Sequence, residues 1–491
     1  MASPHHANPA HLAFTERIVT SLRHAPTTGQ SRAIDAFARL LATTQPGATL
    51  ILRGYAGTGK TTLVGALVSA LRSARAPVVL LAPTGRAAKV LSAHARMTAS
   101  TIHRRIYRVG DEGDGYALGM APNKDAGALF IVDEASMIGG SSQEEGFGSR
   151  DLLGDLIEHV AFAPGCKLLF VGDPAQLPPV GSDQSPALSA RHLRSLGLAA
   201  GAVELTEVVR QSEASGILRN ATDVRGLLFP QAAVAQDPSG SDSSQPILPR
   251  FRAYPDVIRT DGYDLQEALE SAYARDGDDE VCVITRSNKR AYLYNQQVRV
   301  RIHGYEEELN PGDRLMVVKN NYFWAGLNGK PELIANGEPI TVKRLHRSEE
   351  RYGLRFADLT VSWWSGNEER ELEVKVMLDT LAAESPALPA ERMRLLIQAV
   401  REAHAGKSRR EVAKLMREDP HANALQVKYA YAVTCHKAQG GQWRTVFVDQ
   451  GYLTEEMVDR EYLRWLYTAV TRATDRLHLL NFHPRFWGDA D

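Results

Sequence analysis

The sequence predicts an α/β protein with two parallel-sheet units and a small all-β unit inserted in the second. Short β-branched runs at 49–54, 77–83, 128–134 and 167–173 are each followed by a helical pattern, as in parallel strands that are buried on both faces. A second set of such runs follows at 280–287, 429–434 and 445–449. Residues 308–376 instead contain short alternating runs separated by turns, the pattern of a small β-barrel.

Length and composition predict a multidomain globular protein. The chain has 491 residues, which is more than one ordinary domain contains. Hydrophobic residues make up 44% and charged residues 23%, and 57 Lys and Arg nearly balance 58 Asp and Glu. Any contact with a polyanion must therefore come from locally placed cations. The three cysteines are widely spaced, which excludes a CxxC metal site and fits a reducing compartment.

No segment has the pattern of a secretory signal or a membrane span. The start, MASPHHANPAHLAF, lacks the apolar region of a signal peptide, and no apolar run is long enough to cross a bilayer. We therefore expect a cytoplasmic protein with no membrane partner. The Pro, Ser and Gly residues at 236–246 predict a mobile loop between the two sets of strands.

Two smaller features interrupt the sheets. Residues 105–120 contain two extended runs around a Gly/Asp turn, which predicts a β-hairpin. Residues 389–419 have a helical pattern with a strongly charged face. The predicted units are a flexible N-terminus (1–25), a first sheet unit (26–204) with the hairpin in 104–127, a second sheet unit in two parts (205–307 and 421–491), and the insertion between those parts (308–420).

The segment GYAGTGKTT (54–62) predicts a phosphate-binding loop. It matches G-x-x-x-x-G-K-[ST], follows a predicted strand and opens a helical pattern. Glycines let backbone N–H groups approach phosphate oxygens, and the helix N-terminus adds partial positive charge. Lys60 can then reach the β- and γ-phosphates, and the Thr61 hydroxyl can ligate Mg²⁺. The predicted phosphate-binding residues are Gly57, Thr58, Gly59, Lys60, Thr61 and Thr62.

The segment FIVDEAS (130–136) supplies two neighbouring carboxylates. Asp133 and Glu134 end a predicted buried strand, where adjacent acids are costly unless they serve a cation or a proton transfer. Asp133 is the natural partner of Mg²⁺, and Glu134 is the group that polarises an attacking water. Together with the phosphate-binding loop, these residues predict an NTPase that uses ATP and Mg²⁺.

Six further segments carry polar residues beside predicted strands or helices. They are APTGRAAKVL (82–91), STIHR (100–104), GDPAQLPPVG (172–181), LTEVVRQ (205–211), VTCHKAQGGQW (433–443) and YTAVTRATDRL (467–477). The amide of Gln176 could sense a γ-phosphate, because it both donates and accepts hydrogen bonds. Arg210 and Arg472 supply guanidinium groups, which suit contact with an anion.

In this order and spacing, the segments resemble the motif series of superfamily 1 helicases and are closest to the 5′→3′ branch that includes RecD and the phage Dda helicase. The resemblance covers about residues 26–230 and 280–485. It implies two RecA-like domains that bind ATP between them, and it identifies the insertion as an SH3-like barrel with a helical tower. Arg472 and Arg210 would reach the γ-phosphate when the cleft closes. Gln30, in TTGQSRAIDAF (27–37), would bind the adenine.

The resemblance also implies where nucleic acid would lie. The strand backbone would contact Pro83, Thr84, Arg86, Thr101 and His103 in the first domain, and Thr434 and His436 in the second. Small hydroxyls and backbone amides at strand ends suit phosphate contacts, which position a strand without reading its sequence. Relatives carry a strand-separating pin at the predicted hairpin, and Tyr107 and Tyr116 are candidates for it. The alternative is that these tyrosines pack on a surface hairpin.

The function implied is that of an ATP-dependent 5′→3′ DNA helicase. It would act as a nucleoid-associated monomer on single-stranded DNA and on junctions between single and double strands, with partners from DNA replication or repair. The polarity follows from the resemblance and not from individual residues. Two alternatives stay open: an RNA-directed helicase of the same superfamily, and a RecD-type ATPase subunit of a larger DNA-processing complex.

Overall fold

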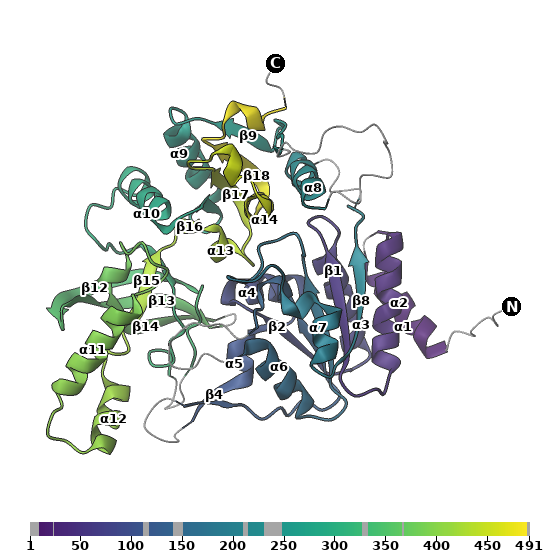
Figure 1. Cartoon of the computed structure of the whole chain (residues 1–491), viewed down its shortest axis with the longest axis horizontal. Helices are drawn as coiled ribbons and strands as arrows, with labels where there is room; N and C mark the ends of the chain where they lie inside the picture. The colour runs from purple at the N-terminus through teal and green to yellow at the C-terminus, as the bar shows by residue number, and fades with distance from the viewer. Residues whose placement is uncertain are drawn as a thin grey trace.

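The chain folds into two parallel sheets, a closed barrel and a hairpin. Figure 1 shows the second sheet above the first, with the barrel beside both. The computed structural model describes residues 9–22, 24–110, 117–140, 151–209, 215–229, 248–326, 332–365 and 368–488. Among these residues, no helix is both long enough and apolar enough to cross a membrane.

The first sheet contains six parallel strands in the order β3-β2-β6-β7-β1-β8. The strands are β1 (Ala48–Gly54), β2 (Val78–Ala82), β3 (Ser100–Thr101), β6 (Leu129–Val132), β7 (Lys167–Gly172) and β8 (Ala199–Leu205). Successive side chains of β1 alternate between two cores, with Leu50 and Leu52 in one and Ile51 in the other. This two-sided burial explains the continuous apolar runs of the sequence.

Helices cover both faces of the first sheet. One core contains residues of α1 (Pro9–Ser21), α2 (Thr28–Ala42), α3 (Lys60–Ser73) and α4 (Gly85–Ala95). The other contains residues of α5 (Ile102–Ile106), α6 (Leu152–Ala161) and α7 (Ala190–Ser195). The short strand β3 and the Ala- and Gly-containing strand β8 have weak strand signals and were not predicted.

The N-terminal segment differs from the expectation that residues 1–25 are flexible. Pro9–Ser21 forms α1, which lies beside α3. Ile18 is fully buried, and Phe14 and Leu22 pack against the same core. Phe14 and Ile18 are four residues apart and therefore lie on one face of the helix, and Leu22 directly follows its end at the same spacing. The expectation of a flexible segment was therefore wrong for this helix, which is part of the first core.

Replacement of Ile18 by alanine is expected to lower the free energy of unfolding of the first domain by about 2–5 kcal/mol, because it leaves a cavity between α1 and α3. Urea unfolding of the whole chain measures this loss. The matched control is Val19→Ala on the same helix, because the Val19 side chain is exposed. If the two substitutions had equal small effects, α1 would not be packed as described.

The second sheet contains five parallel strands in the order β16-β10-β17-β18-β9. The strands are β9 (Val257–Thr260), β10 (Val281–Thr285), β16 (Ala432–Thr434), β17 (Trp443–Asp449) and β18 (Ala473–Leu480). Helices α8 (Gly216–Leu228) and α14 (Arg460–Val470) cover one face. Helices α9 (Leu265–Asp276) and α10 (Asn288–Gln297) cover the other. The four-residue strand β9 was not anticipated.

The insertion forms the predicted barrel, which is closed. Its strands are β11 (Arg314–Val317), β12 (Pro339–Arg351), β13 (Leu354–Ser365), β14 (Glu368–Met377) and β15 (Leu425–Tyr429). The insertion was expected to end at residue 420, but the last barrel strand, β15, extends it to Tyr429. The run 429–434, which was expected to be one strand, ends β15 in the barrel and forms β16 in the second sheet. Because both environments bury apolar side chains, composition alone does not reveal the division.

The charged stretch at 389–419 forms two helices, α11 (Ala390–Glu402) and α12 (Arg409–Glu418). Gly406 has a φ of 94° between them, in the left-handed region that glycine tolerates. Ser408 and Glu411 form a capping box that starts α12. Figure 1 shows both helices extending from the barrel at the lower left.

The predicted hairpin is present. Strands β4 (Tyr107–Gly110) and β5 (Ala117–Met120) pair in antiparallel fashion, with Tyr107 opposite Met120. The turn between the strands, including Tyr116, lies outside the described residues. The same is true of Arg210 and of the segment 236–246.

Candidate nucleotide site and nucleic-acid surface

The phosphate-binding loop connects β1 to α3. Gly57 and Gly59 have φ values of 75° and 80°, a region that residues with a side chain rarely adopt. The Thr58 side chain is buried, and its hydroxyl donates to the Tyr55 carbonyl at 2.8 Å. The first turn of α3 then carries a half-buried Thr61 and an exposed Thr62. The backbone has the conformation that lets the N–H groups of such a loop face a phosphate.

Lys60 has three oxygen neighbours at the mouth of the loop. Its Nζ donates to the carbonyl oxygens of Gly54 at 2.6 Å and Tyr55 at 2.9 Å. It also lies 3.8 Å from Oδ2 of Asp173, which ends the neighbouring strand β7. The ammonium group is therefore placed between β1 and β7 by first-domain groups alone.

Gln30 connects α2 to the phosphate-binding loop. Its Oε1 accepts from the Thr27 N–H at 3.1 Å, and the Thr27 hydroxyl accepts from the Gln30 N–H at 3.2 Å, which forms a capping box. Its Nε2 donates to the Thr58 carbonyl at 3.0 Å. Since both ends of the amide have protein partners, a hydrogen bond to adenine would require an exchange of partners, and it stays a prediction.

Asp133 and Glu134 lie directly after β6, as expected. Burial, together with the neighbouring Glu134 carboxylate, raises the pKa of Asp133 to about 6. Glu134 has a φ of 52°, an unusual value for a residue other than glycine. A carboxylate that interacts electrostatically with Lys60 of the loop suits a divalent cation. The described residues contain no cluster of three or more metal-ligating side chains, but Mg²⁺ bound with phosphate and water needs only one or two carboxylates.

Arg472 is a second-domain residue that lies at this site. It follows α14, and its Nη1 lies 3.9 Å from Oε1 of Glu134. Its Nε donates to the Thr468 carbonyl at 3.0 Å, and its Nη1 donates to the Gly441 carbonyl at 3.3 Å. Only 3% of the residue is exposed. Second-domain groups therefore hold a guanidinium group against a carboxylate of the first domain.

Gln176 lies after β7, in a segment that forms hydrogen bonds with the second domain. The residue is buried, and its Oε1 accepts no hydrogen bond from the residues that the structure describes. The next residue, Leu177, donates its N–H to the Thr468 hydroxyl at 2.9 Å and accepts from Gln439 Nε2 at 2.7 Å. An unpaired buried acceptor is costly, so the Gln176 amide is suited to a ligand in the cleft.

Two residues of the site were not assigned from the sequence. The Tyr467 hydroxyl accepts from the Ala56 N–H at 2.7 Å and donates to Oδ2 of Asp173 at 2.8 Å. Asp173 directly follows β7, just as Asp133 directly follows β6. Its position after a predicted strand could therefore have identified it as a site residue. Tyr467 lies in an apolar helix, where a tyrosine is more often part of the core. Only the packing of the two domains reveals its contact.

The first-domain residues expected to contact nucleic acid lie at the junction with the second domain. The Thr84 hydroxyl accepts from the Ala87 N–H at 3.2 Å and caps α4. A Cβ on Gly440 would lie 3.3 Å from that hydroxyl and 2.7 Å from the Ala87 Cβ. The Arg86 guanidinium lies 3.7 Å from the ring centre of Trp443. Arg86 is therefore stacked between the domains, and its contact with nucleic acid stays a prediction; Pro83 nearby is half-buried.

The helix after β3 carries the next group of expected contacts. The Thr101 hydroxyl is buried and caps α5 by accepting from the Arg104 N–H at 3.2 Å. Burial lowers the pKa of His103 to about 4, which keeps its ring neutral at pH 7. Tyr107 is also buried, and its hydroxyl donates to Asp155 at 2.6 Å. Tyr107 is thus a packing residue at the base of the hairpin, so it is not the tip residue of a pin.

Residues of the barrel also lie against α4 and α5 of the first domain. Glu338 is buried and accepts from Trp363 Nε1 at 2.7 Å, with Arg104 Nη2 at 3.8 Å. A Cβ on Gly85 would lie 2.7 Å from Oε1 of Glu338. The barrel carboxylate therefore lies against the start of α4. Trp363 belongs to the core of the barrel, whereas the neighbouring Trp364 is 45% exposed.

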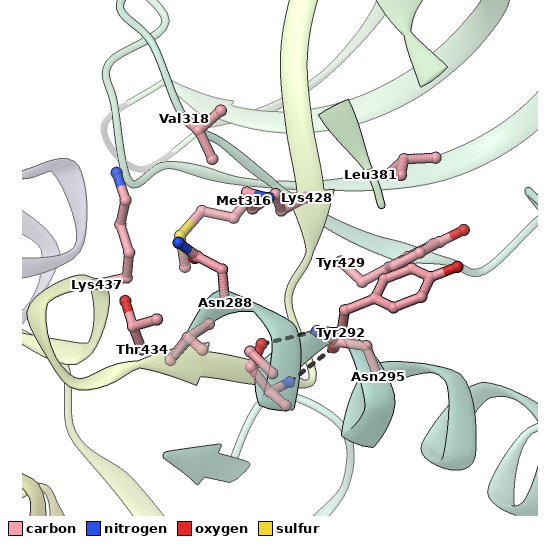
Figure 2. Close-up of a pocket in the computed structure, with 13 residues that line it drawn as sticks. Asn288, Tyr292, Asn295, Met316, Val318, Leu381, Lys428, Tyr429, Thr434 and Lys437 are labelled. Atoms are coloured by element: carbon pink, nitrogen blue, oxygen red, sulfur yellow. Dashed lines mark hydrogen bonds between the residues drawn. The ribbon is translucent and has the colours of Figure 1, made fainter. Parts of the chain in front are cut away.

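The second-domain contacts lie beside a pocket between α10, the barrel and α13 (Cys435–Ala438). Figure 2 shows Thr434 and Lys437 on the side of this pocket opposite Leu381. Burial, with the nearby Lys437, lowers the pKa of Lys428 to about 8. His436, on the same short helix, is exposed. Both lysines that line this pocket already donate within the protein, Lys428 to the Thr380 and Ala383 carbonyls and Lys437 to Asn336.

Comparison with known proteins gives matches to both domains. An AAA domain model matches residues 26–226, and a UvrD-like helicase C-terminal domain model matches residues 429–480. The ATP-dependent RecD2 DNA helicase of Deinococcus radiodurans is 28% identical over 440 residues, which cover 87% of this chain and 46% of that protein. The chain therefore spans about half the length of this relative.

The ATP-dependent DNA helicase dda of Enterobacteria phage T4 is 24% identical over 345 residues, which cover 66% of this chain and 72% of that protein. Among solved structures, the Pif1 helicase from Candida albicans aligns over 94% of this chain and 95% of that chain at 16% identity. The TM-score of that alignment is 0.40, too low to add to the assignment. The relatives, the domain matches and the two parallel sheets with a barrel agree, and together they support a superfamily 1 helicase of the RecD and Dda type.

Proposed function

We propose that this protein is an ATP- and Mg²⁺-dependent DNA helicase that moves 5′→3′ on single-stranded DNA. One observation carries the proposal: the Arg472 guanidinium of the second domain lies 3.9 Å from the Glu134 carboxylate of the first. Because hydrolysis requires groups from both domains, each turnover depends on how the domains are placed. A DNA strand that both domains contact would then be moved by the same change in domain placement.

Residues of both domains would contribute to phosphoryl transfer. Lys60 binds the β- and γ-phosphates, Glu134 polarises the attacking water, and Arg472 stabilises the charge that spreads over the transferred group. Thr61 and Asp133 are the residues that would hold Mg²⁺, which neutralises charge on the phosphate oxygens when bound. The remaining predicted contacts are Gln30 with adenine, and Gln176 and Arg210 with the γ-phosphate.

The proposed nucleic-acid partner is single-stranded DNA with its junctions to duplex. The two relatives described above are DNA helicases by name, which favours DNA over RNA. On the protein, the exposed His436 and the half-buried Thr434 beside it are the second-domain residues proposed to contact a strand backbone. Contacts of this kind hold a strand without selecting a sequence. We propose that the protein acts as a monomer.

Unwinding of matched duplexes with a 5′ tail, a 3′ tail or no tail tests the proposal. We expect ATP-dependent unwinding of the 5′-tailed duplex alone, and stronger stimulation of ATP hydrolysis by DNA than by an RNA strand of the same sequence. Unwinding from the 3′ tail would contradict the polarity. Stronger stimulation by RNA would favour an RNA helicase, and DNA-stimulated hydrolysis without unwinding would favour an ATPase subunit of a larger complex.

A further inference from the structure

The Tyr467 hydroxyl forms a direct hydrogen-bonded connection between the second domain and the phosphate-binding loop. Tyr467 lies on α14, and only 1% of the residue is exposed. Its oxygen is 2.7 Å from the Ala56 N of the loop and 2.8 Å from Oδ2 of Asp173. Burial raises the pKa of this hydroxyl well above its usual range, so the group stays protonated and donates to the carboxylate while it accepts from the amide.

Asp173 connects the hydroxyl to the lysine of the loop. Its Oδ1 accepts from the Ala175 N–H at 2.9 Å. Its Oδ2 accepts from Tyr467 and lies 3.8 Å from Lys60 Nζ. At that length the contact with Lys60 is electrostatic and is not a hydrogen bond. The hydrogen bonds of Lys60 go to the Gly54 and Tyr55 carbonyls, so they do not depend on the tyrosine.

These contacts involve donors that a phosphate would use. In a loop of this type, backbone N–H groups and the lysine ammonium bind phosphate oxygens. The Ala56 N–H points to a protein hydroxyl instead, and that hydroxyl comes from the other domain. A phosphate oxygen can bind this N–H only by taking the place of the Tyr467 hydroxyl.

We propose that Tyr467 is a positioning residue that regulates nucleotide binding, because its hydroxyl donates to Asp173 and occupies the Ala56 N–H until a phosphate oxygen takes that N–H. This inference rests on the proposed function, since it takes the ligand of the loop to be a nucleoside triphosphate. The same helix carries Thr468, which binds Leu177, and it ends next to Arg472. Replacement of the hydroxyl by phosphate at the Ala56 N–H therefore removes one of the contacts between this helix and the first domain, while the Thr468 contact stays.

Tyr467→Phe removes the hydroxyl and keeps the ring. Without the hydroxyl, the half-buried Ala56 N–H lacks its partner until a phosphate binds. We therefore expect a fluorescent ADP analogue to bind about tenfold more tightly, as the loss of one partly buried hydrogen bond implies. Hydrolysis without DNA should rise relative to the DNA-stimulated rate. Amide hydrogen exchange of the loop peptide, measured without nucleotide, should become faster.

The matched control is Tyr462→Phe. Tyr462 is buried on the same helix, but its hydroxyl accepts from Gln450 Nε2 at 2.9 Å within the second domain. General destabilisation of α14 would affect both variants, whereas the inference requires a change in Tyr467→Phe alone. Unchanged or weaker nucleotide binding by Tyr467→Phe, at an unchanged melting temperature, would overturn the inference. If the wild-type protein itself bound no nucleotide, the proposed function would fail instead.

Discussion

Replacement of Arg472 by alanine is expected to slow ATP hydrolysis by about 10³–10⁵-fold, the range seen when such an arginine is absent from phosphoryl-transfer enzymes. Nucleotide affinity should change little, because Lys60 and the loop amides bind the phosphates from the first domain. The physical reason is the placement of the guanidinium group 3.9 Å from Glu134, where it can meet charge that develops during the reaction. Single-turnover hydrolysis and equilibrium binding of a nucleotide analogue measure the two effects separately.

Arg472 also donates to the Thr468 and Gly441 carbonyls, so a structural role must be distinguished from a catalytic one. Arg472→Lys keeps the charge but loses the planar fork, and hydrolysis should stay strongly impaired. The matched control is Arg476→Ala, because Arg476 is exposed on the adjoining strand β18. An equal loss of nucleotide affinity and hydrolysis would show that Arg472 serves the fold and not the reaction.

Replacement of Lys60 by alanine is expected to reduce hydrolysis by at least about 10²–10³-fold, as for the removal of one fixed donor to a developing charge. The ammonium group lies between the Gly54 and Tyr55 carbonyls and Asp173, at the mouth of the phosphate-binding loop. Affinity for single-stranded DNA should stay close to that of the wild type, because the predicted strand contacts lie elsewhere. Steady-state ATPase assays and fluorescence anisotropy of a labelled DNA strand measure the two properties.

Arg191→Ala is the control for Lys60→Ala, because Arg191 is an exposed cation on α7 of the same domain. It should leave both hydrolysis and DNA affinity unchanged. Unaltered hydrolysis in Lys60→Ala would remove the assignment of the loop as the nucleotide site. Loss of DNA binding in Lys60→Ala alone would instead show that the lysine contributes to the fold around α3.

Features formed by neighbouring residues were predictable from the sequence. The loop from Gly57 to Lys60 forms through its own glycine conformations and the start of α3. Asp133 and Glu134 end a strand whose apolar run is continuous. The barrel was also predictable, because its long strands alternate with a period of two. The split between β15 and β16 was not, since both strands are apolar and only their hydrogen-bonded partners differ.

The placement of single polar side chains was less predictable. The sequence did not show that Arg86, a predicted nucleic-acid contact, stacks on Trp443, or that Tyr107, a candidate for the pin, donates to Asp155 inside the first domain. A short motif specifies which residues are present, but burial by a distant segment decides whether they are exposed. Tyr467 shows the converse case, because its contact with Ala56 joins two segments far apart in the sequence.

By itself, the sequence determined the two parallel sheets, the inserted barrel, the phosphate-binding loop and the carboxylates at the end of β6. Each of these depends on local backbone preference or on a periodic pattern of apolar residues. The tertiary structure alone decided that Arg472 meets Glu134, that Tyr467 reaches Ala56, and that the barrel carboxylate Glu338 lies against α4. Those contacts arise because separate sheets and the barrel pack together, and no local pattern records which distant side chains will then face each other.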